Sequence, residues 1–599
     1  MKPECLSISL LSQAVAAAVV AVSLSSPAIS APFSGSPVAP SLPGAGSLNN
    51  QLQQEKNKPL LTPQRPALVL PADTSGLLAR PPVDSSARVV ISRVRFTDMP
   101  SGVRVKEADL QKLLRQDLNR PLGFAGLQQI AEKVTDYYRQ HGLLLARAVL
   151  PPQTVRDGVL TVTVIPGRFD DSSANGHSRL RDGILRRMLD ATTPAGDVIR
   201  RSQLERLALL LNETPGVKAQ VALQTGKTPG TAAVNVTVSD DKRVGGYVGT
   251  DNLGSSTTGR GRLMGGFYAG ELLRTGDLLQ ADALLTYEHT DILTGSVDYS
   301  SLINGYGTRA GLGYSRLDYQ YTLQGMDFSG YFDNWDIYLS HPWLRNGSAR
   351  FDARLEGGQQ LLTDKYPAEF SVNDNRGRKI VNYISGGING SAASLPGGVT
   401  GLGLTFTTGR VNYRNDTARF WSGADVRGTT GQFARLNYWL QHEQQLTGPF
   451  SVYASVTGQF ANQNLDASQK LLLGGPASVR AYDVGDGAAD NGTIATVEMR
   501  SRWTLPSAYL PGTAPTLTVS PFYDQGWGQQ NRDNTSPLNG QRLTAQNHFS
   551  LAGAGLSVSL ADSGNYSLSM TWARRTTSTA PVSGHKDRDR FWLSAVKTF

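Results

Sequence analysis

The last three-fifths of the chain alternates polar and apolar residues at almost every position. Between residues 243 and 599 there are about sixteen such segments of roughly nine to fourteen residues, separated by turns rich in Gly, Asn, Asp and Ser. A period of two is typical of β-strands, in which successive side chains point to opposite faces of a sheet. The pattern therefore predicts an all-β region over residues 242–599, without helices.

The two faces of these segments differ in chemistry. In TIATVEMRSRW (493–503) an apolar face alternates with a charged face that carries Glu498, Arg500 and Arg502. A membrane β-barrel places the apolar face in lipid and the charged face in a wet lumen. We therefore predict a membrane β-barrel of about sixteen antiparallel strands, with these three residues lining its lumen as ordinary water-facing residues or as contacts for a loop or a cargo. A large soluble all-β domain, which would bury one face in a second sheet, remains the alternative.

Residues 88–241 contain two successive units with the same order of elements. The first unit, 88–166, reads as a strand, two helical segments and two strands, and Leu127, Ile130 and Val134 fall on one face of its second helix. The second unit, 167–241, repeats this β-α-α-β-β order and begins with a short strand, RFDD. This internal repeat predicts two small α/β domains in front of the barrel.

The N-terminus reads as a secretory signal peptide over residues 1–30. Lys2 precedes an apolar run, and the small residues that follow favour cleavage after Ser30. The next segment, 31–87, is a Pro-rich linker, although its polar patch SLNNQLQQEKNK (47–58) is compatible with a helix of about three turns. Whether this patch is a helix or part of a disordered linker stays open at this point.

Composition argues against several classes of function. The formal net charge is +9, but no Lys or Arg run typical of nucleic-acid binding occurs. The only cysteine, Cys5, lies in the signal peptide, and the seven His residues form no metal-binding motif, so we expect no metal and no cofactor. TGKT (225–228) mimics the end of a phosphate-binding loop, but Val221 stands where the first Gly is required. No arrangement of nucleophile and base is visible, so we expect no catalytic residues and no enzyme.

A gap without periodicity, 461–492, interrupts the alternating segments. It contains LLLGGPASVRAYD (471–483), in which Arg480 is the only arginine. A structureless segment of this length is usually functional or disordered. If the chain enters the first strand from the periplasmic side, odd strands run outward, and the gap, which joins the eleventh and twelfth predicted strands, lies on the outer side of the membrane. From there it either stays outside or folds back into the lumen.

These features together resemble the outer-membrane transporters of two-partner secretion, the hemolysin-secretion branch of the Omp85 superfamily. The β-α-α-β-β units look like its POTRA domains. VGGYVGTDNLGSSTTGRGR (244–262) and TGD (275–277) are similar to the start of the family's barrel. GQFANQNLDASQKLLLGGPASVR (458–480) resembles its signature of Gly-Gln, Gly-Gly and Val-Arg-Gly-Tyr/Phe. The matching loop residues are Gly474, Gly475, Val479, Arg480 and Tyr482.

One position departs from the family's signature. Ala481 follows the arginine where the family has Gly. Because Gly permits backbone conformations and close approaches that Ala does not, we expect a slightly different shape and packing at the loop tip.

The resemblance implies that the loop folds back into the lumen and that Arg480 pairs with an aspartate of the barrel wall. The matching aspartate is Asp524, in the segment PFYDQGW. The alternation supports this position independently, because Leu517 and Tyr523 share one face of the strand and Asp524 falls on the other, lumenal face. The planar guanidinium of Arg480 would bind that carboxylate bidentately and latch the loop. A solvated Arg480 in a water-exposed loop is the alternative.

The resemblance also implies a function. Transporters of this kind export a large unfolded exoprotein, such as an adhesin or a hemolysin, across the Gram-negative outer membrane without ATP. The periplasmic POTRA domains would bind this partner, and a helix at 47–58 would plug the resting pore. Further expected partners are outer-membrane lipid and the barrel assembly machinery, with no nucleic acid. An Omp85-type assembly factor and a passive porin are the alternatives, and two POTRA units after a linker favour secretion.

Overall fold

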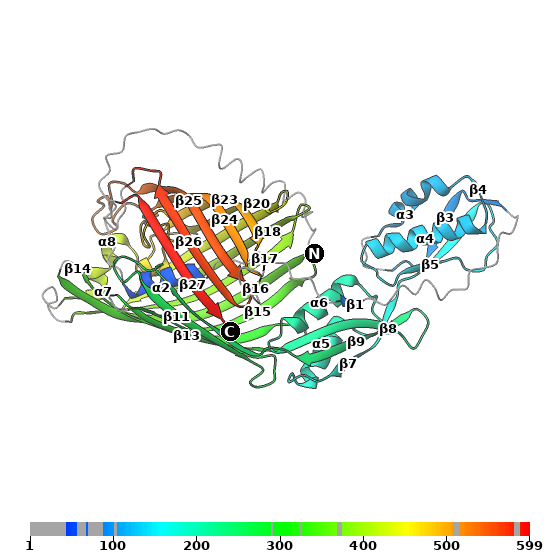
Figure 1. Cartoon of the computed structure of the whole chain (residues 1–599), viewed down its shortest axis with the longest axis horizontal. Coiled ribbons are helices and arrows are strands. Elements are labelled where there is room, and N and C mark those ends of the chain that lie inside the picture. Colours follow the sequence, from blue (N-terminus) through cyan, green and yellow to red (C-terminus); the bar gives the residue numbers. More distant parts are fainter. Residues whose placement is uncertain are drawn as a thin grey trace.

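A computed structural model describes residues 44–56, 68–69, 88–100, 105–288, 292–323, 325–367, 374–506, 514–579 and 587–599. The signal peptide at 1–30 and most of the linker at 31–87 lie outside the described residues. The chain forms a barrel with one helix inside it and two α/β units beyond one of its ends (Figure 1). Within the part of the chain that is described, no helix is long and apolar enough to cross a membrane.

The barrel is a closed antiparallel sheet of sixteen strands, which confirms the predicted fold class. Each strand pairs with its neighbours along the chain, and β10 pairs with β27 to close the ring. The strands are β10 Val244–Asp251, β11 Arg262–Gly270, β12 Leu278–Thr286, β13 Ile292–Leu302, β14 Arg309–Leu323, β15 Met326–Arg345, β16 Ala349–Lys365, β17 Arg376–Ala393, β18 Gly398–Tyr413, β19 Gly431–Gln445, β20 Phe450–Ala461, β23 Asn491–Thr504, β24 Thr516–Gln529, β25 His548–Asp562, β26 Tyr566–Arg575 and β27 Asp589–Thr598.

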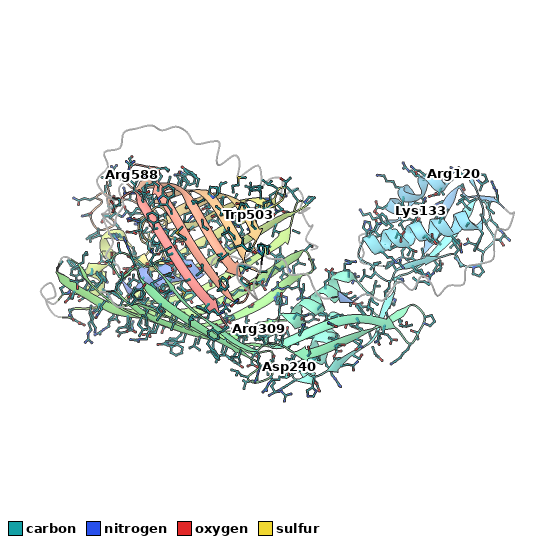
Figure 2. The ribbon with its side chains drawn as sticks, viewed as in Figure 1. Arg120, Lys133, Asp240, Arg309, Trp503 and Arg588 are labelled. Atoms are coloured by element: carbon teal, nitrogen blue, oxygen red, sulfur yellow. The ribbon has the colours of Figure 1, made fainter. Side chains whose placement is uncertain are left out.

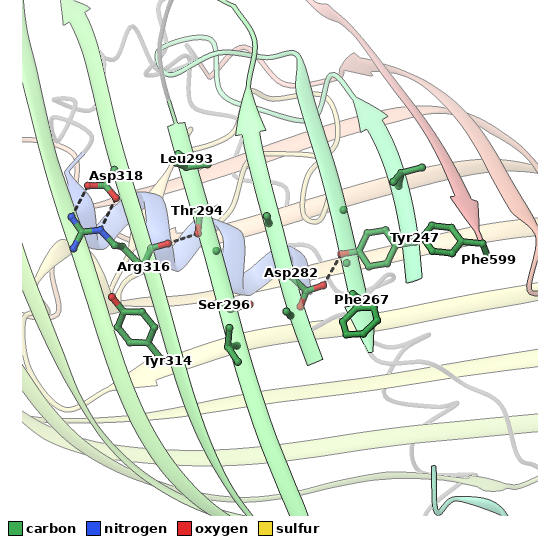
Figure 3. Close-up of a pocket in the computed structure, with 17 residues that line it drawn as sticks. Tyr247, Phe267, Asp282, Leu293, Thr294, Ser296, Tyr314, Arg316, Asp318 and Phe599 are labelled. Atoms are coloured by element: carbon green, nitrogen blue, oxygen red, sulfur yellow. Dashed lines mark hydrogen bonds and ion pairs between the residues drawn. The ribbon is translucent and has the colours of Figure 1, made fainter. Parts of the chain in front are cut away.

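The inner and outer faces of the barrel wall follow the alternation in the sequence. Figure 3 shows part of this wall, where the Tyr247 hydroxyl donates a hydrogen bond to the inward-facing Asp282 at 2.8 Å. On the outer face Phe267 and Leu293 are exposed and border a shallow apolar groove of about 690 Å³. This face is apolar enough to lie against lipid, as a membrane barrel requires.

The prediction that residues 243–599 contain no helices is wrong at one place. The connection between β18 and β19 contains two short helices, α7 (Asp416–Trp421) and α8 (Ala424–Arg427). The side chain of Asn415 caps α7 by accepting the N–H of Ala418, and the left-handed Gly423 separates the two helices. Both are too short to produce a visible helical period in the sequence.

The first POTRA-like unit packs helices on a small sheet. Its helices are α3 (Glu107–Leu114) and α4 (Phe124–Gln140), and its strands are β3 (Arg93–Thr97), β5 (Arg147–Val149) and β6 (Val159–Ile165), in the order β3-β6-β5. A second, two-stranded sheet joins β2 (Val89–Val90) to β4 (Pro121–Leu122). The predicted helix face is central to the core, because Ile130 and Val134 are buried.

The second unit has the same design. It contains β7 (Arg168–Gly176), α5 (Asp182–Thr192), α6 (Arg201–Asn212), β8 (Val217–Thr225) and β9 (Thr231–Asp240). The first strand is longer than the predicted RFDD because it pairs with β9 as far as Gly176. A short strand from the linker, β1 (Leu68–Val69), pairs parallel with β8 at the edge of this sheet, in the order β1-β8-β9-β7.

Polar contacts join the second unit to the end of the barrel. Arg206 on α6 donates hydrogen bonds to the carbonyls of Pro342 at 2.7 Å and Tyr306 at 3.0 Å. Glu213, just after α6, forms an ion pair at 3.0 Å with the buried Arg345. Figure 2 shows Arg309 of the barrel at this junction. These contacts fall on the turn before β14 and on the last residues of β15, so the unit docks on one side of the barrel mouth.

Candidate functional site: the inward loop and the helix in the lumen

The connection between β20 and β23 folds into the barrel, and most of its residues are buried. It includes a 3-10 turn, η4 (Ala467–Gln469), and a small hairpin of β21 (Leu471–Leu472) and β22 (Ala488–Ala489). Two buried ion pairs hold its stem. Lys379 of β17 binds Asp466 at 3.0 Å, and within the loop Lys470 binds Asp490 at 2.6 Å.

The structure brings Arg480 and Asp524 together. The Arg480 Nη2 and Nε atoms lie 2.7 Å and 2.8 Å from the two carboxylate oxygens of Asp524, which is the bidentate geometry. The Arg480 backbone N–H also donates to this carboxylate, and its Nη1 donates to Glu498 at 2.8 Å. The guanidinium lies 3.4 Å from the centre of the Phe522 ring. Asp524 is fully buried, so the pair is shielded from water and salt.

The three lumenal residues expected from the sequence extend this pair into a longer network. Arg500 binds Glu498 at 2.8 Å and Glu443 of β19 at 2.8 Å, and Arg502 also binds Glu443. Charges thus alternate in sign along the wall, from the loop tip toward the end of the barrel that carries the POTRA-like units. We call Asp524, Arg480, Glu498, Arg500, Glu443 and Arg502 the ion-pair ladder. Glu443 was not predicted, because the alternation gives the face of a side chain but does not show which side chains of nearby strands reach one another.

The other motif residues shape the loop tip. The N–H of Gly474 donates to the Asp486 carbonyl at 2.8 Å, and a side chain at this position would collide with the backbone. Gly475 has φ +123°, which favours glycine. Val479 and Tyr482 are fully buried, and the Tyr482 hydroxyl lies 2.8 Å from that of Thr577. The signature therefore describes a tip that is packed on all sides.

Ala481 fits this tip because of a glycine on the opposite wall. Its side chain is 1% exposed and faces Gly553 of β25. A Cβ placed on Gly553 would lie 2.3 Å from that of Ala481, so the two positions share space for one methyl group. The alanine at this position, where the family has glycine, therefore fits because Gly553 has no side chain.

A second set of contacts fixes the loop near the closing strands of the barrel. Asp483 forms ion pairs with Arg590 of β27 at 3.0 Å and with Arg260 at 3.4 Å. Trp592, also on β27, donates its indole N–H to the Arg480 carbonyl at 2.7 Å. These residues were not predicted, although Asp483 lies only three positions after Arg480.

Helix α2 (Ala45–Lys56) lies inside the barrel and covers most of the polar patch at 47–58. Its N-terminus is bound by the barrel wall, since the Ala45 N–H donates to Asp364 at 2.9 Å. Its middle is bound by the loop, since the Asn50 amide donates to the Lys470 carbonyl. Near its C-terminus Glu55 pairs with the buried Arg262 at 2.8 Å.

The attachment of Glu55 continues into the wall. Arg262 also binds Asp251 at 2.7 Å, and both of these residues are buried. Asp251 belongs to the stretch at 244–262 that is similar to the start of the family's barrel. Burial raises the pKa of the Glu55 carboxyl above its usual range, although Arg262 opposes this shift.

An apolar surface of the lumen faces α2. It draws side chains from eight consecutive strands, β13 to β20, and they pack with Ala45 and Leu48 of the helix in one buried cluster. We call this surface the apolar belt. Its members are Ile292, Leu317, Tyr319, Tyr321, Phe328, Phe332, Leu362, Val381, Val411, Phe433 and Ala461.

Helix α2 is held between this belt and the loop. A side chain on Gly46 would lie 2.5 Å from Ser468 of the loop and 2.8 Å from Leu362 of the belt. Belt, helix and loop therefore lie side by side in the outer half of the lumen, as the blue helix inside the barrel shows (Figure 1). Among the described residues no cluster of three or more His, Cys, Asp or Glu is arranged to hold a metal ion.

Comparison with known proteins assigns the chain to a family. The family model for the haemolysin secretion/activation proteins ShlB/FhaC/HecB matches residues 230–560, more than half of the chain. The chain belongs to the haemolysin secretion/activation family. A model for the ShlB-type POTRA domain matches residues 89–167. Members of this family are outer-membrane transporters of two-partner secretion, so the barrel lies in the outer membrane and the POTRA units in the periplasm.

Individual relatives cover most of the chain, and one of them covers it almost completely. The heme/hemopexin transporter protein HuxB of Haemophilus influenzae strain 86-028NP is 30% identical over 93% of this chain and 95% of its own. The outer membrane transporter CdiB of Escherichia coli O6:K15:H31 is 27% identical over 62% of this chain and 63% of its own. The solved structure of CdiB from Escherichia coli has the same fold, with a TM-score of 0.69 over 94% of this chain and 100% of that one, at 22% identity.

Proposed function

We propose that this chain exports an unfolded exoprotein through its barrel, and that α2 and the inward loop together close the resting pore. One observation carries the proposal: α2 lies in the lumen, attached to the wall at both ends and to the loop in its middle. If α2 lay in the lumen without a function, an ion pair between Glu55 and a buried arginine of the wall would not be expected. Membership of a secretion family favours this function over assembly of other barrels or passive diffusion.

Opening of the pore requires both occupants to move. Helix α2 leaves by giving up its contacts with Asp364, Lys470 and Arg262, and this frees one side of the loop. The loop then rearranges by releasing Arg480 from Asp524 and Glu498. We assign the Arg480–Asp524 pair the role of a latch, because a buried bidentate pair resists displacement until a competing contact replaces it.

The POTRA units receive the partner in the periplasm. An extended segment of the partner adds to a free sheet edge and gains main-chain hydrogen bonds. In the second unit β1 covers the β8 edge, whereas β7 forms the other end of that sheet. We assign the docking of the partner to β7 in this unit. The barrel itself contacts outer-membrane lipid and is inserted by the barrel assembly machinery.

Ion conductance of the purified protein in planar bilayers tests the closed state. The full-length mature chain should give low, flickering conductance, and a variant lacking residues 44–56 should give high conductance, because the plug is gone. A variant lacking residues 31–43 is the matched control, since it shortens the same segment but keeps α2, and it should behave like the full-length chain. High, steady conductance in all three proteins would show that α2 does not close the pore.

A further inference from the structure

The apolar belt is far larger than α2 requires. The helix offers a narrow apolar edge, with Ala45 and Leu48 buried and Leu52 partly buried, whereas the belt extends over half of the barrel wall. The position of α2 is set mainly by polar attachments, at Asp364, Lys470 and Arg262. Leu465 of the loop packs in the same cluster and every belt residue is buried at rest, so the belt is covered by α2 and the loop together and loses part of this cover when α2 leaves.

A water-filled pore would not normally line its lumen in this way. Lumen-facing positions of membrane barrels are generally polar, and the ion-pair ladder follows that rule. Once α2 leaves, the belt is exposed to water, which disfavours the open state unless another apolar group covers it. The next occupant of the pore is the exported chain.

The belt also continues to the outer mouth as a row of aromatic rings. Tyr319, Tyr321 and Phe328 follow one another with ring centres 6.0 Å and 5.2 Å apart. Tyr366 and Trp421 of α7 continue the row, stacked at 4.5 Å. A cavity of about 180 Å³ beside the N-terminus of α2 is bordered by these rings and by the charged side chains of Asp364, Lys379 and Asp466. Aromatic faces bind apolar groups with little demand for a specific sequence.

We infer that the apolar belt is the binding surface for extended apolar segments of the exported partner, and that α2 occupies it only in the resting state. This inference rests on the proposed function, and it adds where the partner binds in the pore. The occupant is an extended peptide in which apolar and polar residues alternate, because successive side chains of an extended chain point to opposite sides. Its apolar side meets the belt, and its polar side faces the loop and the water of the lumen.

Blockade of the pore by defined peptides tests the inference. The protein is the chain lacking residues 44–56, measured in planar bilayers. One probe is a soluble Gly/Ser-rich peptide with spaced Leu residues, and the other is the same peptide with Ser in place of each Leu. Burial of one Leu side chain corresponds to a change of about tenfold or more in dwell time, so the Leu peptide should block the pore at least about ten times longer.

Belt variants show where the difference arises. Phe433→Ser, in the belt, should reduce the ratio of the two dwell times several-fold, and Phe433→Leu should keep it. Phe406 on the neighbouring strand β18 faces outward and is 52% exposed, so Phe406→Ser is the matched control and should leave the ratio unchanged. The heat-dependent mobility of the folded barrel on gels confirms that each variant is folded.

The outcomes separate the inference from the proposed function. Equal dwell times for the Leu and Ser peptides, in a pore that conducts and is blocked by both, would overturn the inference and leave the closed-pore model intact. A ratio that Phe433→Ser and Phe406→Ser reduce equally would also overturn it. No gain of conductance on removal of residues 44–56 would instead contradict the proposed function.

Discussion

Two sides of the lumen hold α2 and the inward loop by different kinds of contact. On one side the apolar belt, built from side chains of eight strands, packs with Ala45 and Leu48 of α2, and these apolar contacts have no directional requirement, unlike the polar attachments that set the position of the helix. On the other side the loop is held by the ion-pair ladder, in which donor and acceptor geometry decide whether a contact exists. Apolar side chains of different shapes can pack on an apolar surface, whereas a buried ion pair forms only with a partner of opposite charge in the right geometry. The belt is therefore suited to contact different segments of a passing chain. The ladder is suited to hold a loop that must return to one position.

The strongest test of this contrast removes the buried end of the ladder. Asp524→Ala leaves the Arg480 guanidinium buried with only Glu498 as its carboxylate partner, and loss of one partner of a buried pair costs about 3–5 kcal/mol. We expect the loop to become protease-sensitive and export of the cognate exoprotein to fall more than about tenfold, because 1.4 kcal/mol is a factor of ten. Limited proteolysis of whole cells and immunoblots of the culture medium measure both effects.

The matched control for that variant is Asp318→Ala. It removes an aspartate from an ion pair with Arg316, but its side chain is 46% exposed on the outer surface of the barrel. Exposed pairs contribute about 0–1 kcal/mol, so export should change little. Equal losses in Asp524→Ala and Asp318→Ala would mean that burial of the ladder has no role.

The variant Gly46→Val tests the packing of α2 against the belt. The added side chain would collide with Ser468 and Leu362, and overpacking of this kind costs about 1–3 kcal/mol. We expect α2 to leave the lumen in part of the molecules and single-channel conductance to rise several-fold. Gly295→Val makes the same change on the outer face, where the nearest atom to the new Cβ is 3.5 Å away, and should leave conductance unchanged.

The packing of the loop tip is tested by moving one methyl group. Gly553→Ala should displace Ala481, destabilise the docked loop by about 1–3 kcal/mol and raise its protease sensitivity. The double variant Gly553→Ala, Ala481→Gly carries the methyl on the other side of the contact and should recover most of the loss. A double variant as sensitive as the single one would show that the two positions do not share space.

The smallest effect is expected at the exposed end of the ladder. The Arg502 side chain is 37% exposed and its partner is Glu443, so Arg502→Ala should cost no more than about 1 kcal/mol. Export should remain within about fivefold of the parent protein, as measured by the same immunoblots. A loss as large as that of Asp524→Ala would mean that the ladder acts as one cooperative unit.

The barrel was predictable because a period of two runs through most of its strands. Asp524 could be placed in the lumen for the same reason, since its neighbours Tyr523 and Leu517 fix the outer face. The arginine that meets it came from a resemblance and not from the pattern, because a loop has no period from which to infer its path.

Other parts of the site could not be read from the order of residues. Glu55 and Arg262 are 207 positions apart, and no pattern in the sequence around either residue indicates that α2 lies beside β11. The compensation between Ala481 and Gly553 depends on how the loop tip meets β25, which no local rule determines. The belt is equally hidden, because its members come one or a few at a time from eight strands that each look like an ordinary barrel segment.

The pairing of β1 with β8 has a mechanical consequence for α2. Only residues 57–67 connect the C-terminus of the helix to that strand, and a chain of this length spans at most roughly 40 Å. While β1 remains paired, a helix that has left the pore is tethered beneath the periplasmic mouth at an effective concentration on the order of millimolar. If α2 leaves the pore as proposed, its rebinding is an intramolecular event, and we expect the pore to reseal after export without a second protein.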